Sequence, residues 1–136
     1  MACIFCKIVK GEIPSAKVYE DNGVFAFLDI KPFTKGHCLI ISKKHFENIF
    51  DITEDALQKV FVAAKKLSEK IKNVLHADGI RLSQSNGKSA GQEVMHFHLH
   101  IIPRYNNDGL SANPTATLHL PMTDFEELKE LAEKLR

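Results

Sequence analysis

Three histidines, His96, His98 and His100, alternate with Phe97 and Leu99 in the most informative segment of this sequence. Successive side chains of a β-strand point to opposite faces, so a strand here places the three imidazoles on one face and the apolar residues on the other. Histidine titrates near neutral pH and adds little to strand packing. Three of them on one face therefore indicate a site, and the apolar side is expected to pack inward.

Two kinds of chemistry fit such a strand. A His-x-His pair can hold catalytic zinc, which predicts a metal-dependent hydrolase. Alternatively, a neutral imidazole can attack a phosphorus atom and later leave it, so that one difficult displacement becomes two easier ones. The second ring nitrogen must then donate its proton to an acceptor, which a strand backbone can supply. The strand alone does not separate these two possibilities.

A glycine-containing loop precedes the histidines, because residues 86–92 read Asn-Gly-Lys-Ser-Ala-Gly-Gln. Small residues let backbone N–H groups approach a phosphate closely, and an amide side chain can bond a ribose or bridging oxygen. A loop of this kind is by itself more typical of a plain turn. Next to three histidines it indicates the second wall of a phosphate pocket, which favours a histidine nucleophile over the metal-dependent hydrolase.

A Cys-x-x-Cys pair, Cys3 and Cys6, lies near the N-terminus. Two free thiols are one interpretation; the other is a tetrahedral zinc site, for which His45 and His96 are available as further ligands. We expect structural Zn²⁺ that ties the N-terminus to the histidine strand. A thioredoxin-type redox role is disfavoured, because the pair does not follow a strand of a βαβ unit. Cys38 lies in an apolar segment and is interpreted as a buried filler.

The elements that must position these residues can be predicted from turn signals and periodicity. Residues 17–20 and 23–29 are expected to form a hairpin around Asp21 and Asn22. Further strands are expected at 37–42, 79–85 and 94–104. Residue 37 follows a loop rich in proline and glycine, which delivers His37 to the start of its strand.

Two helices complete the prediction. Apolar residues recur at three- and four-residue steps from Thr53 to His76, which predicts a long amphipathic helix. Its N-terminus is either a capping box of Asp51 with Glu54 or a cap at Thr53. A closing helix is expected to begin near Thr123. Separate runs of strands and helices predict an α+β fold, in which an antiparallel five-stranded sheet carries the long helix and the C-terminal helix.

Length and composition bound the remaining possibilities. The chain has 136 residues, 44% of them hydrophobic and 26% charged, with a formal net charge of +1. One domain over residues 1–136 is expected, with a core at about 3–104 and a variable tail at 105–136. The small net charge argues against extended nucleic acid as a partner. No apolar run approaches the ~20 residues of a membrane span, and the start lacks a signal-peptide core, so a cytoplasmic location is expected.

Several motifs together resemble the histidine triad (HIT) superfamily. The main one is Asn86-Gly-x-x-x-Gly91-Gln92-x-Val94-x-His96-Phe-His98-Leu-His100-Ile-Ile. The segments at 13–14, 27–30, 36–40 and 42–45 match the family in order and spacing, so the resemblance covers about residues 3–104. Agreement over this length is far more specific than a lone His-x-His.

The resemblance implies a homodimer whose two sheets join, with a purine nucleotide pocket on each subunit. The middle histidine of the family attacks the α-phosphorus of a phosphoramidate, an adenylate or a dinucleoside polyphosphate. The resulting nucleotidyl-histidine is then hydrolysed by water. The family also includes proteins that use the Cys-x-x-Cys pattern, with the first histidine of the triad, as a zinc site. A non-catalytic nucleotide-binding regulator is a further alternative.

Residue by residue, the resemblance makes His98 the nucleophile, with His37 and His100 beside it. It places Asn86, Gly91, Gln92 and Glu93 around the phosphate and ribose, Asp29 at the ribose hydroxyls, and Ile13, Phe27 and Ile30 at the base. Glu93 departs from the family pattern, since many members have Ser or Thr there. A carboxylate at that position repels a phosphate unless it turns away, so the group that protonates the leaving atom stays open between His37 and His100.

Overall fold

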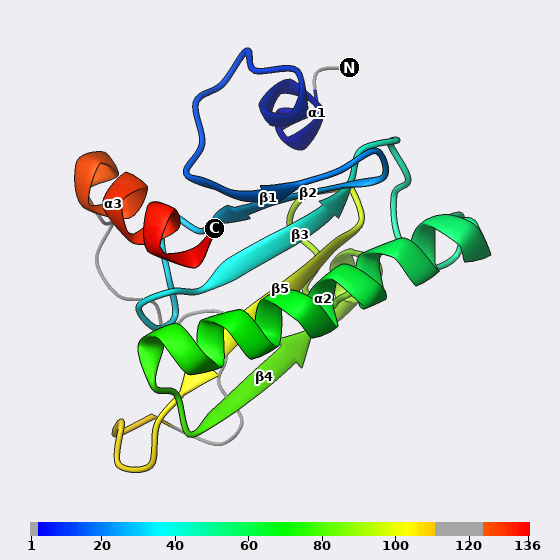
Figure 1. The fold of residues 1–136 in the computed structure, drawn as a ribbon. Helices are drawn as coiled ribbons and strands as arrows, with labels where there is room; N and C mark the ends of the chain where they lie inside the picture. Colours follow the sequence, from blue (N-terminus) through cyan, green and yellow to red (C-terminus); the bar gives the residue numbers. More distant parts are fainter. Residues whose placement is uncertain (1–2, 111–123) are drawn as a thin grey trace.

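The computed structural model describes residues 3–110 and 124–136 (Figure 1). Five strands form one antiparallel sheet in the order β1-β2-β3-β5-β4. Their bounds are β1 Lys17–Glu20, β2 Val24–Leu28, β3 Cys38–Ser42, β4 Gly79–Ser83 and β5 His98–Arg104. The helices are α1 Ile4–Val9, α2 Glu54–Leu75 and α3 Phe125–Leu135, with a short 3₁₀ turn at Lys88–Ala90. The predicted α+β class and five-stranded antiparallel sheet are confirmed.

Side-chain caps fix both the first hairpin and the long helix. Between β1 and β2, the Asp21 carboxylate accepts hydrogen bonds from the N–H groups of Gly23 and Val24, at 2.8 and 2.9 Å. This is the local bonding that makes aspartate favourable in tight turns. At the start of α2, the Thr53 hydroxyl accepts from the N–H of Ala56 at 3.2 Å. Of the two predicted caps, Thr53 is therefore the one that the structure shows.

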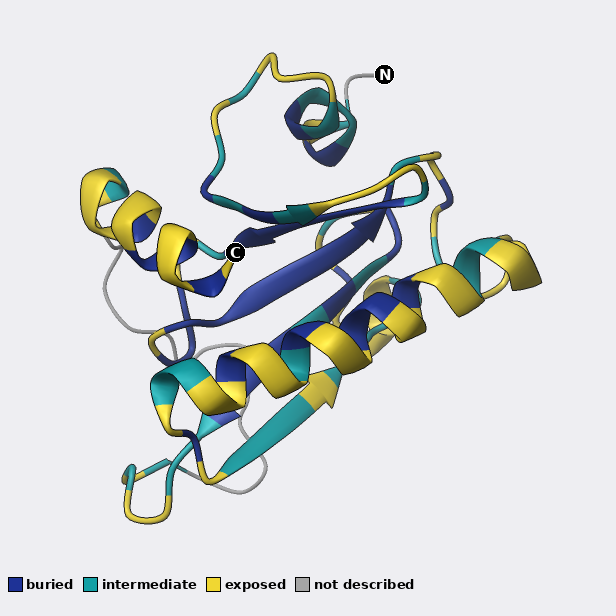
Figure 2. Cartoon of the chain, in the orientation of Figure 1, coloured by how far each residue is buried: buried dark blue, intermediate teal, exposed yellow. Residues whose placement is uncertain are grey.

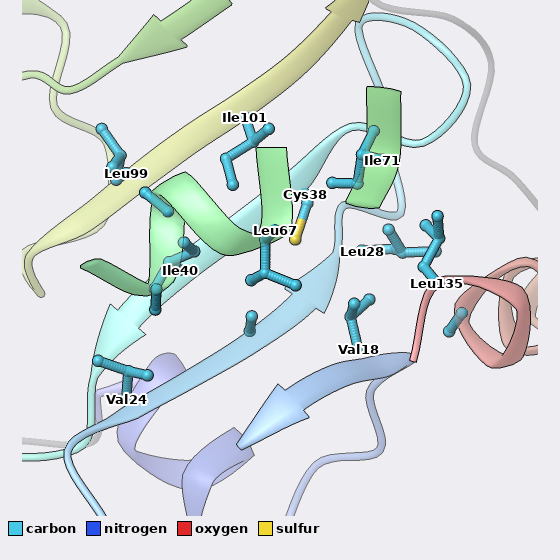
Figure 3. Close-up of a cluster of buried hydrophobic side chains, with 14 of the residues drawn as sticks. Val18, Val24, Leu28, Cys38, Ile40, Leu67, Ile71, Leu99, Ile101 and Leu135 are labelled. Carbon is cyan, nitrogen blue, oxygen red and sulfur yellow. The ribbon is translucent and has the colours of Figure 1, made fainter. Parts of the chain in front are cut away.

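The sheet is covered on both faces, which explains why every residue of β2 and β3 is buried (Figure 2). One face packs against α2 and α3, and Figure 3 shows Leu67 and Ile71 of α2 over the aliphatic residues of the strands. The opposite face packs against α1 through Phe5 and Ile8. Cys38 lies in the α2 face with 0% exposure, as expected for a small buried filler.

The clearest differences from the prediction are the start of β5 and the helix α1. β5 begins at His98 instead of Val94, because its neighbour β3 ends at Ser42 and its last paired residue, Ile41, lies opposite His98. Residues 94–97 therefore have no strand beside them. The helix α1 was not predicted. The expected helix start near Thr123 lies outside the described residues; α3 itself follows Asp124, whose carboxylate accepts from the N–H of Glu127.

Candidate active site

Two neighbouring strands bring three histidines together. His98 and His100 lie on β5, while His37 immediately precedes β3. β3 pairs antiparallel with β5, with Leu39 opposite His100 and Ile41 opposite His98. Because side chains alternate, Leu99 and Ile101 pack under α2, and the two histidines of β5 face the side on which α1 lies. The predicted division into an apolar and an imidazole face is confirmed for this strand.

The ring of His98 is held in one orientation by the backbone. Its Nδ1 lies 2.7 Å from the carbonyl oxygen of His96, which can only accept, so Nδ1 carries the proton and Nε2 keeps its lone pair. Burial lowers the pKa of His98, and this outweighs the His96 hydrogen bond and the charges of Asp29 and Glu93, which act to raise it. The imidazole is therefore neutral at pH 7, as a nucleophile requires.

A chain of hydrogen bonds fixes the tautomers of the other two histidines. The N–H of Phe33 donates to Nδ1 of His37 at 2.9 Å, so that nitrogen is an acceptor. His37 Nε2 then carries the proton and lies 2.9 Å from Nδ1 of His100. His100 accepts this bond, which leaves its own Nε2 as a donor. Asp29 lies nearby, with Oδ2 3.9 Å from His37 Nε2.

These histidines line a cavity of about 620 Å³, a volume within the usual range of small-molecule sites. The cavity has an apolar end and a polar end. The apolar end is formed by α1, β2 and β3 together with the chain around Ile13, and includes Ile4, Phe5, Ile8, Ile13, Phe27, Ile30 and Leu39. The polar end is formed by β5, β4 and the loop between them, and includes His98, His100, Arg81, Ser83, Ser85, Gly91 and Glu93.

The helix α1 joins the nucleophile to the apolar end. The ring of Phe5 contacts that of His98 edge-on, with centroids 5.2 Å apart, and that of Phe27 at 5.5 Å. Phe5 is buried, and it belongs to the smaller apolar cluster under α1. The sequence prediction missed this residue. A helix of six residues that includes Cys6 and Lys7 shows too little periodicity to be recognised.

Four predicted metal ligands do come together. The ligand atoms of Cys3, Cys6, His45 and His96 all lie within 4.8 Å of one another. The Sγ–Nδ1 distances are 3.4 Å for Cys3 with His96, 3.4 Å for Cys6 with His45 and 3.5 Å for Cys6 with His96. The two Nδ1 atoms are 3.2 Å apart.

These distances fit a tetrahedron around zinc. Zn–S and Zn–N bonds of about 2.3 and 2.05 Å give S···N edges of about 3.5 Å and an N···N edge of about 3.3 Å. The orientation of His96 also fits. Its Nε2 donates to the carbonyl of Ser42 at 2.7 Å, which leaves the lone pair of Nδ1 directed at the thiols. Burial is the main reason why the pKa of His96 falls to about 4, so this lone pair persists at neutral pH.

Asp29, His37 and His100 form a second group that satisfies the distance criterion for a metal site. Here the geometry favours hydrogen bonding. The separation of 2.9 Å between the nitrogens of His37 and His100 is a normal hydrogen bond and is shorter than the edge of about 3.3 Å that two imidazoles on one zinc require. His98 belongs to neither group. The metal-dependent use of the histidine strand is therefore the weaker of the two sequence hypotheses.

Two predicted phosphate-binding residues lie away from the cavity. The Oδ1 of Asn86 accepts from the N–H of Ile49 at 2.7 Å, and its amide pairs with Gln84. Gln92 is 3% exposed, and its amide donates to the carbonyls of Glu47 and Val94. Neither residue lines the cavity. Both amides hold the loop together, whereas the other predicted substrate residues, Gly91, Glu93, Asp29, Ile13, Phe27 and Ile30, do line it.

The structure adds β4 as a wall of the cavity. Arg81, Ser83 and Ser85 alternate along the chain and line the same face. The alternation of residues in the predicted strand at 79–85 could have indicated that these three side chains share a face. The prediction instead took Asn86, the first residue of the glycine loop, as the cavity residue of this segment. Ser83 pairs with His100 and Arg81 with Ile102, so the serines are the residues of this wall on the side of the nucleophile.

Comparison with known proteins places the chain in a family. A model described as the HIT domain matches residues 10–107. The protein named Hit from Bacillus subtilis is 50% identical over 111 residues, which cover 81% of this chain and 77% of the relative. The adenosine 5'-monophosphoramidase HNT1 of Candida albicans is 40% identical over 140 residues, covering 99% and 90% of the two chains. The chain thus belongs to the HIT family.

Solved structures agree with this assignment. A zinc-bound histidine triad family protein from Mycobacterium smegmatis is 36% identical and has a TM-score of 0.83, with 99% of this chain and 94% of that chain covered. The fold is therefore that of HIT proteins. In the described part of the chain, no helix has the length and apolar character to cross a bilayer.

Proposed function

We propose that this protein hydrolyses purine nucleotide phosphoramidates at the α-phosphorus, with His98 as the nucleophile. One observation carries the proposal: the backbone of His96 holds Nδ1 of His98, so a neutral Nε2 remains in a cavity that also offers an apolar slot. The Candida albicans relative is named an adenosine 5'-monophosphoramidase, which supports this class of reaction. Adenylates and dinucleoside polyphosphates contain the same phosphorus centre and are further candidate substrates.

The reaction has two displacements. In the first, the lone pair of His98 Nε2 forms a bond to phosphorus, and the bond from phosphorus to the leaving group breaks. In the second, water attacks the phosphorus of the nucleotidyl-histidine, and the electron pair of the P–N bond returns to His98. The proton stays on Nδ1 and is donated in a hydrogen bond to the His96 carbonyl throughout, which stabilises the positive charge that the ring carries in the intermediate.

The hydrogen-bond chain prepares the site for phosphate. Because Phe33 orients His37 and His37 orients His100, the remaining N–H of His100 can donate to a phosphoryl oxygen without rearrangement. His37 is 2% exposed, so solvent does not compete for these bonds. Gly91, with φ of 95°, allows the loop backbone to approach the same phosphate.

The remainder of the nucleotide fits the other end. A purine base is flat and largely apolar, and Ile13, Phe27 and Ile30 contribute to a slot closed by α1. Asp29 lies between this slot and the histidines, where a carboxylate can accept hydrogen bonds from both ribose hydroxyls. Its N–H donates to the carbonyl of His37 at 2.9 Å, which fixes its position relative to the triad.

The Cys-x-x-Cys pair is proposed to hold structural zinc with His45 and His96. Four ligands close the coordination shell, so zinc here would act as a clamp and would not bind substrate. The matching distances and the zinc-bound relative from Mycobacterium smegmatis support this. The clamp connects α1, which forms a cavity wall, to the residue whose carbonyl orients His98.

The homodimer and the cytoplasmic location also stay proposals. β4 is an edge strand that, within the described residues, pairs only with β5, and Leu82 on it is 46% exposed. Unpaired strand edges are templates for joining a second sheet. Sedimentation analysis of the purified protein measures the oligomeric state; a monomer at micromolar concentration contradicts the dimer.

The decisive experiment compares wild type with His98→Ala on adenosine 5'-phosphoramidate. Turnover should fall by at least ~1,000-fold, as expected for removal of a covalent nucleophile, while AMP still binds. Rapid quenching of wild type with a radiolabelled substrate should place the label on a peptide containing His98. His76→Asn is the matched control, since His76 is an exposed helix cap with φ of 53°, a conformation that asparagine tolerates.

The alternatives predict other results. A metal-dependent hydrolase loses turnover when chelator removes zinc from an intact fold. A non-catalytic regulator binds AMP stoichiometrically and turns over neither phosphoramidates nor dinucleoside polyphosphates. Undiminished turnover by the His98 variant removes that residue from its proposed role.

A further inference from the structure

Glu93 is a charged group that the two displacements above do not use. It lies in the loop between the 3₁₀ turn and β5, is exposed, and lines the cavity. Its charge reaches the nucleophile, because it is one of two carboxylates whose fields act on His98. Among the described residues, Glu93 has no ion-pair partner that neutralises it. Its negative charge therefore acts on whatever occupies the cavity.

The sheet order shows which part of a substrate meets Glu93. The apolar slot lies over β2 and β3, His98 lies on β5, and β4 lies on the far side of β5. A nucleotide with its base in the slot and its phosphorus at His98 extends its leaving group toward β4 and the Glu93 loop. Arg81, the cationic residue of this wall, lies opposite Ile102, beyond His100 and away from His98. Glu93, whose charge acts on His98, is therefore the charged residue of this wall expected beside the leaving atom.

We propose that Glu93 is a specificity-determining residue that selects amine leaving groups and rejects phosphate leaving groups. This inference rests on the proposed function and narrows it to phosphoramidates of basic amines. The amine nitrogen takes its proton before the P–N bond breaks, so it carries positive charge in the transition state, and the carboxylate stabilises that charge. A departing polyphosphate gains negative charge, which the same carboxylate destabilises. One fixed charge therefore lowers the free energy of one transition state and raises that of the other.

Water is the only co-reactant that the two displacements need. The His98 Nε2 lone pair forms the new bond to phosphorus, and the electron pair of the broken P–N bond stays on the amine nitrogen, which takes a proton from solvent. Water then adds to phosphorus, His98 leaves with its electron pair, and the proton released by the water returns to solvent. The sum is phosphoramidate plus water to amine plus AMP. Glu93 exchanges no proton in these steps and supplies only its field.

The experiment compares wild type with Glu93→Gln, which keeps the shape and removes the charge. Two substrates share the AMP portion: an adenosine 5'-phosphoramidate of a primary alkylamine, and diadenosine tetraphosphate. The ratio of their kcat/KM values, amine over polyphosphate, should fall on the order of tenfold or more, as expected for one unit charge at a partly solvated site. Glu130→Gln, an exposed change of equal charge on α3 at the other face of the sheet, should leave the ratio unchanged.

A ratio that stays within twofold of wild type, or that rises, overturns the assignment of Glu93. A binding measurement separates this failure from failure of the proposed function. If wild type turns over neither substrate, the proposed hydrolase function is wrong. Calorimetric titration with adenosine, ADP and ATP then still tests whether the charge of Glu93 opposes the binding of phosphate groups. Glu93→Gln should then strengthen binding of ADP and ATP severalfold relative to adenosine. Equal affinities in both proteins contradict the role of Glu93 even without catalysis.

Discussion

The side chain and the backbone of His96 serve two different sites. Its Nδ1 lies 3.4 Å from Sγ of Cys3 in the proposed zinc cluster, while its carbonyl oxygen lies 2.7 Å from Nδ1 of His98. The orientation of the nucleophile therefore depends on a residue that is held by the N-terminus. Because His96 is 0% exposed and also donates to Ser42, it has little freedom to move without disturbing both sites.

Zinc removal should weaken nucleotide binding, because Cys3 caps α1 and Cys6 lies within it, and the same helix carries the Phe5 wall of the cavity. We expect one zinc per chain by elemental analysis. We also expect the AMP dissociation constant of Cys3→Ser or Cys6→Ser protein to rise severalfold, with circular dichroism showing the sheet retained. Equal AMP affinity with and without zinc contradicts this coupling.

Thiol counting provides the control for the zinc prediction. Burial raises the pKa of Cys38 to about 12, so this thiol stays protonated and unreactive in the folded protein. A thiol reagent should modify Cys3 and Cys6 only after chelation, and Cys38 only after unfolding. Modification of Cys38 in the native protein would show that the core under α2 opens.

Lowering the pH should reduce the free energy of unfolding through protonation of Asp108. Its carboxylate accepts from Arg104 Nε at 2.7 Å and from the N–H groups of Tyr105 and Leu110, and the Arg104 bond is the main cause of a pKa well below the usual value. A lowered folded-state pKa means that the contribution to stability is complete above the unfolded value of about 4 and is lost as the pH falls through the folded value.

The variant Asp108→Asn tests the direction of this pH dependence. Denaturant unfolding should show the variant to be less stable than wild type at pH 7. The difference should shrink as the pH falls below about 4, because the carboxylate of the unfolded wild-type chain then takes up a proton before the folded one does. A difference that does not change with pH assigns the effect to packing or backbone bonds and not to the carboxylate charge.

Gly36 precedes His37 and should not tolerate alanine. Its φ is 94°, and a Cβ there would overlap Cδ1 of Leu75 at the end of α2. Gly109 has a φ of 74° and nothing within 4 Å of the same position, so Gly109→Ala has the backbone strain without the clash. We expect unfolding free energies lowered by about 1 kcal/mol for Gly109→Ala, and by about 2–4 kcal/mol for Gly36→Ala. An equal loss of unfolding free energy in the two variants would show that the Leu75 side chain moves aside at no cost.

The sequence predicted the elements whose signals are local. Alternation gave β5 and its two faces, the three- and four-residue steps gave α2, and Asp21 gave the first turn. The start of β5 could not be predicted, since it depends on where β3 ends, more than 50 residues earlier in the chain. Strand length is here a property of a pair of strands and not of one segment.

The site was predicted unevenly for the same reason. Histidines and cysteines are chemically distinctive, so both clusters could be anticipated from residue type. The contact of Asn86 could not be anticipated, because its Oδ1 accepts from the N–H of Ile49, which lies 37 residues away in sequence. Ser85, one position earlier, lines the cavity instead. Phe5 was missed because α1 shows too little periodicity to be recognised, although the zinc site predicted for Cys3 and Cys6 already tied this segment to the histidine strand.

The cysteines of the zinc cluster are separated from His96 by 93 and 90 residues. During synthesis on the ribosome, both thiols therefore emerge long before the ligand that joins them to the nucleophile strand. Zinc can be enclosed by all four ligands only after β5 emerges and pairs with β3. Metal capture at the proposed site would thus come late in folding, and the growing chain exposes the thiols of Cys3 and Cys6 for most of its synthesis.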